Sequence, residues 1–85
     1  MALRHNPEII AKRLDNATVL VDVPSSRIFE LNETGTCIWE LLGKGVDVDS
    51  ISRQLVDRYE IDHAQAQNEV RNLITRLRAE GLLEE

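Results

Sequence analysis

The sequence predicts an α+β domain in which a small antiparallel sheet precedes three helices. Runs rich in β-branched residues and bounded by turn residues fill its first third, whereas the remainder shows helical spacing of apolar residues. Residues 27–42 join the two parts, because an alternating strand there passes almost directly into a helix that begins after Asn32. A strand placed in this way forms a sheet edge beside helices, which suits the binding of an extended peptide.

Length and composition predict one domain over residues 1–85, with residues 1–6 as a loose end. The hydrophobic content is 42% but the aromatic content only 4%, so Leu, Ile and Val must fill the core. No stretch approaches the roughly 18 apolar residues of a membrane span, and the N-terminus lacks the apolar region of a secretory signal. We therefore expect a cytoplasmic protein with no membrane partner.

Three strands are expected. The first starts after Pro7 and places residues 9–12 in alternation, with one face buried. The second covers residues 18–23, and residues 24–26 reverse the chain into the third strand at residues 27–31, whose exposed edge is expected over residues 26–31. Three antiparallel strands make a sheet that still needs helices to cover its apolar face.

Three helices follow the sheet. The first covers roughly residues 33–42 and ends at glycines 43–45. Asp47 is the predicted N-cap of the second helix, and Asp62 that of the third, which ends near Gly81. Residues 82–83 are expected to form a short closing strand. Three helices with helix–turn–helix spacing beside a small sheet describe a winged helix–turn–helix-like domain.

Charge separates two functional classes for such a fold. The net charge of −5 opposes a nucleic-acid partner, because DNA-binding domains gain affinity by neutralising phosphates. The alternative of a small helix–turn–helix DNA-binding regulator rests on Arg71, Arg76 and Arg78 of the third helix, which Glu69 and Glu80 dilute.

No catalytic or metal-binding constellation is apparent, so we expect a non-enzyme without a cofactor. Cys37 is the single cysteine, and His5 and His63 have no ligand at metal-binding spacing. A nucleophilic role for Cys37 would need a base that no motif supplies.

Several motifs resemble the PqqD-like family. They are residues 29–35 (FELNETG), residues 38–42 (IWELL), the acid-capped second helix with its Tyr59, and residues 80–83 (EGLL). The resemblance covers about residues 15–85. It implies three strands and three helices in a winged helix–turn–helix arrangement, and a peptide-recognition function in pathways that modify ribosomally made peptides.

The resemblance further implies that the leader segment of a precursor peptide adds as a strand to the third strand, beside the third helix. It implies a second partner, a cognate maturation enzyme or leader peptidase, in a pathway such as that of a lasso peptide or a quinone cofactor. An exposed edge also permits a homodimer.

The expected peptide-binding residues lie on two elements. On the edge strand they are Arg27, Ile28, Phe29, Glu30 and Leu31, with Phe29 and Leu31 on the core side. On the third helix they are Val70, Leu73, Ile74 and Leu77, with Arg71 and Arg78 placed to pair with acidic leader residues. The alternative interpretation is that the apolar members are core residues and the arginines are solvated surface charges.

Overall fold

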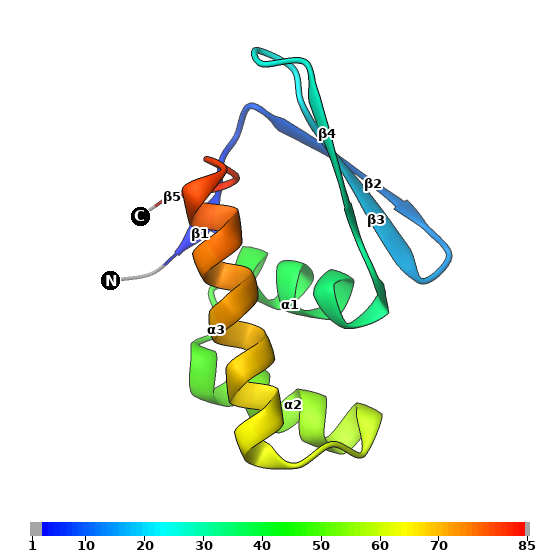
Figure 1. The fold of residues 1–85 in the computed structure, drawn as a ribbon, viewed down its shortest axis with the longest axis vertical. Helices are drawn as coiled ribbons and strands as arrows, with labels where there is room; N and C mark the ends of the chain where they lie inside the picture. The colour runs from blue at the N-terminus through cyan, green and yellow to red at the C-terminus, as the bar shows by residue number, and fades with distance from the viewer. Residues whose placement is uncertain (1–2, 85) are drawn as a thin grey trace.

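The computed structural model describes residues 3–84, and its arrangement is shown in Figure 1. A three-stranded sheet lies beside three helices, and a second, two-stranded sheet joins the two ends of the described chain (Figure 1). The elements in chain order are β1 (Arg4–His5), β2 (Ile9–Leu14), β3 (Ala17–Asp22), β4 (Arg27–Leu31), α1 (Glu33–Gly43), α2 (Val48–Tyr59), α3 (His63–Ala79) and β5 (Leu83–Glu84). The α+β prediction is confirmed.

The larger sheet has the strand order β2–β3–β4, with both pairs antiparallel. Strand β3 is central, so β4 is an edge strand as predicted. The expected buried face of the first strand is wrong, because only Ile9 of β2 is half-buried and the other five residues are exposed. The reason is that α1 packs on β3 and β4, whereas β2 lies at the other edge of the sheet, beyond β3.

Each helix begins at the residue that the sequence indicates. The side chains of Asn32, Asp47 and Asp62 accept hydrogen bonds from the backbone N–H three residues on, at 2.7–2.8 Å. The bond from Ser50 N–H lowers the pKa of Asp47 below its ordinary value, because it stabilises the carboxylate. These caps satisfy backbone donors that the first helical turn leaves unpaired.

The core lies where α1 packs on β3 and where α3 packs on α2. Leu20 of β3 and Ile38 of α1 are almost fully buried, and so are Ile51 and Leu55 of α2. Thr18 donates a buried hydrogen bond of 2.9 Å to Thr36, which ties β3 to α1. Within residues 3–84, no helix is long and apolar enough to cross a membrane.

The N-terminal segment differs from the sequence prediction of a loose end. Arg4 and His5 form β1, which pairs with β5. The His5 ring stacks on Trp39 with ring centroids 3.5 Å apart, and its Nε2 lies 2.7 Å from the Trp39 carbonyl oxygen. Gly43 permits this contact, since a Cβ there would lie 2.6 Å from His5 Cε1. Residues 1–2 of the predicted loose end lie outside the described chain.

Candidate functional site

A groove runs between the edge strand β4 and the helix α3. It consists of two adjoining hollows of about 410 Å³ and 240 Å³, which share Glu30, Leu31, Leu73 and Arg76. Figure 1 shows β4 and α3 on its two sides, with the start of α1 at one end. The groove residues are Ile28, Phe29, Glu30, Leu31, Asn32, Thr34, Gly35, Ile38, Glu69, Asn72, Leu73, Arg76, Leu77, Glu80 and Leu82.

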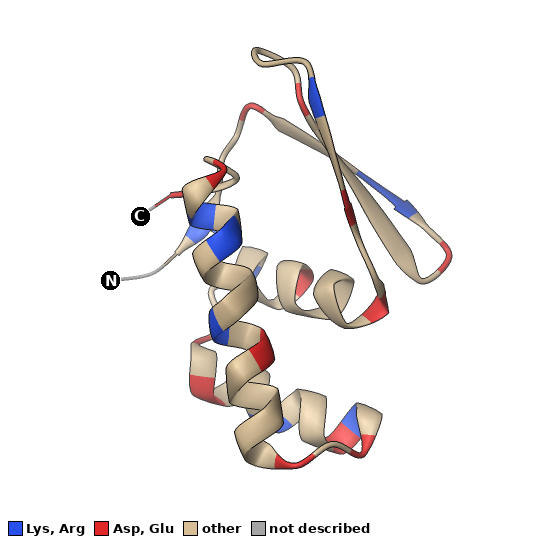
Figure 2. Ribbon diagram, viewed as in Figure 1, with Lys and Arg blue, Asp and Glu red and all other residues tan. Residues whose placement is uncertain are grey.

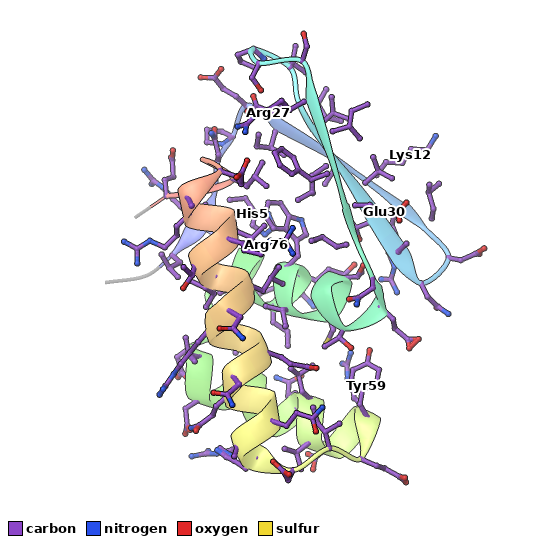
Figure 3. The ribbon with its side chains drawn as sticks, viewed as in Figure 1. His5, Lys12, Arg27, Glu30, Tyr59 and Arg76 are labelled. Atoms are coloured by element: carbon purple, nitrogen blue, oxygen red, sulfur yellow. The ribbon has the colours of Figure 1, made fainter. Side chains whose placement is uncertain are left out.

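Strand β4 presents one apolar face to the protein interior and an opposite face to solvent. Leu31 is buried and Phe29 is half-buried against the core, whereas Ile28 is 70% exposed and Glu30 is exposed. Successive strand side chains point to opposite faces, so this alternation follows from the sequence FEL. In Figure 3 the Glu30 side chain points away from α3. Ile28 and Glu30 therefore border the groove at the strand edge, while Phe29 and Leu31 contribute apolar surface inside it.

One face of α3 forms the opposite wall. Its groove residues Glu69, Leu73, Arg76 and Glu80 are spaced by three or four positions, which places them on one side of a helix. A neighbouring face packs on α2 through Ala66, Val70 and Ile74. Leu77 belongs to both, since it is 3% exposed and also lines the apolar part of the groove.

An ion pair spans the groove at the end of α3. Arg27 Nη1 lies 2.6 Å from Glu80 Oε2, and Arg27 Nη2 donates to the Glu80 carbonyl at 3.0 Å. The guanidinium also lies 5.1 Å from the centroid of the Phe29 ring and 3.5 Å from an Asp22 carboxylate oxygen. Figure 2 shows the opposite charges at the facing ends of β4 and α3. This contact covers Phe29 and closes the groove on that side.

The two hollows differ in chemistry. The half next to the Arg27–Glu80 pair, termed the apolar half, contains Phe29, Leu77 and Leu82, which the other half lacks, and it is also lined by Glu80. The polar half, next to the start of α1, is lined by Asn32, Thr34, Glu69 and Asn72. An extended ligand that spans both halves would therefore meet an apolar pocket first and polar side chains next.

The junction of β4 and α1 shapes the polar half. Gly35 lies in the first turn of α1, where an added Cβ would come within 3.2 Å of Asn32 Oδ1 and 3.3 Å of Leu31 Cβ. Glycine thus lets the helix begin directly against the end of the strand, with Asn32 as its N-cap. The motif LNETG therefore forms this end of the groove: Asn32 caps α1, and Gly35 lets α1 start close to the end of β4.

The structure brings together seven of the predicted site residues: Arg27, Ile28, Phe29, Glu30, Leu31, Leu73 and Leu77. It does not bring the other four to the groove. Val70 and Ile74 are 0% and 8% exposed in the core, and neither Arg71 nor Arg78 lines either hollow. Arg71 and Arg78 are seven positions apart and share a helix face that lies away from the groove.

Sequence reasoning missed the polar wall of the groove. Glu69, Arg76 and Glu80 lie four positions before, three after and seven after Leu73, so helical periodicity from that one residue would have found them. The arginines of α3 also do not form one surface, because Arg76 lines the groove and Arg71 does not. Figure 2 shows both signs of charge along α3, which does not favour a phosphate-binding stripe.

Within the described chain, neither His nor Cys side chains line the groove. Among residues 3–84, no three His, Cys, Asp or Glu side chains are grouped so that they could hold a metal ion. Cys37 is buried and accepts a contact from Arg58 Nη1 at 3.4 Å. What the groove offers is an exposed strand edge, an apolar pocket and polar side chains.

The fold and the groove define a winged helix–turn–helix domain with an accessible sheet edge beside its last helix. Residues 17–83 match the family model described as coenzyme PQQ synthesis protein D (PqqD), and the chain belongs to this family. No curated protein sequence matches the chain.

Two solved structures are similar to the chain over nearly its whole length. One is described as lasso peptide synthetase B1 complexed with the leader peptide; it has a TM-score of 0.92 and 27% identity, and all of both chains is covered. The other is described as TbiB1 in complex with the TbiA(beta) leader peptide. It has a TM-score of 0.88 and 23% identity, with 95% of this chain and 94% of that chain covered, and at this identity it supports the fold.

Proposed function

We propose that this protein binds the leader segment of a ribosomally made precursor peptide, as a strand added to β4 beside α3. The observation that carries the proposal is the free edge of β4 along a groove with an apolar pocket. A similar solved protein, of 27% identity, was captured with a leader peptide. Binding is the whole of the proposed activity, without catalysis and without a cofactor.

In strand addition, the main chain and the side chains of the peptide would have different roles in binding. The unpaired N–H and C=O groups of an edge strand bind the main chain of any extended peptide. Specificity then comes from side chains that enter the groove at every second position, about 6.6 Å apart. Leu73 and Leu77 are one helical turn apart, about 6 Å along α3, so alternate ligand residues match successive turns of the wall.

The apolar half would hold the main anchor of the ligand. Phe29, Leu77 and Leu82 are among the apolar residues that line a hollow of about 240 Å³, with Glu30, Arg76 and Glu80 as its charged residues, and the hollow is large enough for one apolar side chain. Burial of a Leu, Ile or Phe side chain there would contribute about 1.5–3 kcal/mol to binding.

A titration of the ¹⁵N-labelled protein with synthetic leader peptides, taken from precursors encoded near this gene, tests the proposal. We expect saturable shifts of the amide signals of β4 and of the groove face of α3, and little change at β2. The same peptides labelled for fluorescence polarisation should bind with weak dependence on salt. Absence of saturable binding, or shifts confined to other elements, would overturn the proposed function.

We further propose that the loaded domain presents the leader to a maturation enzyme or leader peptidase through the outer face of the sheet. Ile10, Val21 and Ile28 are register partners across the three strands and so share that face. Ile10 is 58% exposed and Leu14, on the same side of β2, is 48% exposed. Exposed apolar groups gathered on one face are typical of protein interaction sites. A leader strand on β4 would widen this face.

The outer face can be tested with the change Ile10→Glu, and Lys12→Glu on the same face serves as a charge control. We expect the first change to abolish co-purification with the cognate enzyme and to leave leader binding intact. Retained co-purification would refute this role. A dimer in sedimentation that Ile10→Glu dissociates would assign the face to a second copy of the chain instead.

A further inference from the structure

Arg76 is a cation of the groove, and among residues 3–84 no side chain forms an ion pair with it. It lines both halves, and within residues 3–84 its guanidinium makes no ion pair or side-chain hydrogen bond. In Figure 3 its side chain projects from α3 towards the space beside β4. Arg27 differs, because Glu80 and Asp22 already bind its guanidinium. The groove therefore contains one engaged arginine and one with its donors available.

The acidic groups around the groove do not compete for Arg76. Glu80 is held by Arg27 at 2.6 Å. Glu30 borders the groove through the strand edge, and its side chain points to the outer face of the sheet (Figure 3). Glu69 lies seven positions before Arg76, about 10 Å away along the helix axis. The available partner for this guanidinium is thus a group that the ligand brings.

We propose that the ligand of the groove carries an Asp or Glu whose carboxylate pairs with Arg76, next to the apolar anchor. This inference rests on the proposed function and specifies its ligand. The planar guanidinium offers two parallel N–H donors that match a carboxylate. Arg76 lies where the two halves meet. The ion pair would therefore also select one register for the extended peptide along β4.

A preference for an acidic ligand residue would not be expected from the overall charge of the protein. A net charge of −5 disfavours acidic peptides across most of the surface. Without a local receptor, selection of binding peptides would enrich Lys and Arg. An acidic preference at one ligand position therefore requires a specific cation at the groove, and Arg76 is the group that the geometry offers.

A displayed library of random linear 16-residue peptides, panned against the full-length wild-type protein, tests the inference without knowledge of the natural ligand. We expect the selected peptides to share one Asp or Glu position close to an apolar position. Replacement of that acid by its amide should weaken binding about fivefold, the upper range for an exposed ion pair. The loss should shrink at high salt.

Charge reversal supplies the matched variants. Arg76→Glu should disfavour the acidic peptides and bind their Lys-substituted versions better, whereas Arg71→Glu, on the face away from the groove, should leave both affinities unchanged. Peptides that bind β4 without an acidic position, or equal effects of the two reversals, would overturn this inference and leave the proposed function standing. Failure of the library to yield any peptide that shifts the β4 amide signals would overturn the proposed function itself.

Discussion

The two edges of the main sheet are built alike and differ in what stands beside them. Each edge strand is tied to a helix by an exposed Arg–Glu ion pair, Arg13 with Glu40 at 2.7 Å for β2 and Arg27 with Glu80 at 2.6 Å for β4. Beside β4, however, α3 supplies Leu73 and Leu77 as an apolar wall. A hollow near β2 has no aliphatic wall of this kind; it is lined by His5, Ala11, Thr18, Trp39, Glu40, Gly43 and Lys44.

The comparison shows that an unpaired strand edge is not enough for a recognition site. Both edges offer main-chain donors and acceptors, but the groove beside β4 has the leucine side chains of a second element, α3, as its opposite wall, whereas the hollow beside β2 is lined mainly by residues at and near α1. Specific affinity comes from that second element, because main-chain bonds alone do not discriminate between sequences. The following predictions separate the edges.

The largest difference should lie between the buried side of α3, the helix beside β4, and the exposed strand β2. Ile74→Asp places a carboxylate in the packing between α2 and α3, where Ile74 is 8% exposed, and should cost about 4 kcal/mol or more of unfolding free energy. Leu14→Asp on β2, at 48% exposure, should cost about 1 kcal/mol or less. Urea denaturation followed by circular dichroism measures both. Similar losses for the two variants would contradict the unequal burial of α3 and β2.

An intermediate difference is expected in peptide binding. Leu73→Ala removes groove surface while its half-buried position preserves the fold, and should weaken leader binding about tenfold. Ile10→Ala removes an exposed side chain at the other edge and should change affinity less than about twofold. Fluorescence polarisation gives both dissociation constants. An equal loss of affinity from the change at Ile10 would contradict the proposal that the peptide binds at β4 and not at β2.

The smallest and most discriminating difference concerns the two ion pairs. The four side chains are 41–57% exposed, so Arg13→Gln and Arg27→Gln should each cost less than about 1 kcal/mol of stability. Arg27 also covers Phe29, so its loss should weaken leader binding about threefold, whereas loss of Arg13 should not. Thermal unfolding and polarisation binding on the same samples separate the two effects. If both changes weaken binding equally, the Arg27–Glu80 pair has no role in the groove.

The sequence predicted the elements well because their signals are local. Asn32, Asp47 and Asp62 each bond a backbone N–H three residues away, so the pattern that indicates a helix start is also its physical cause. The burial of β2 could not be predicted in the same way. Alternation shows that a strand has two faces, and only the placement of the helices decides whether either face is covered.

The site was predicted on its strand side and only in part on its helix side. Phe29 and Leu31 followed from alternation and from the motif that leads into α1. On α3, the prediction places Val70 and Ile74 in the groove together with Leu73 and Leu77, although Val70 and Ile74 are core residues. To predict that Arg76 and not Arg71 lines the groove, one must know how α3 is rotated about its own axis. Tertiary packing sets that rotation, and a single sequence does not display it.

The contact between His5 and Trp39 has an optical consequence. The chain contains one tryptophan, and its indole is 3% exposed beneath the histidine ring. Trp39 lines neither half of the groove. Its fluorescence is therefore a signal of whether β1 is seated on α1, and it should remain constant when a peptide occupies the groove. Trp39 fluorescence should thus change when β1 separates from α1 and stay constant when a ligand binds, so it distinguishes the two events.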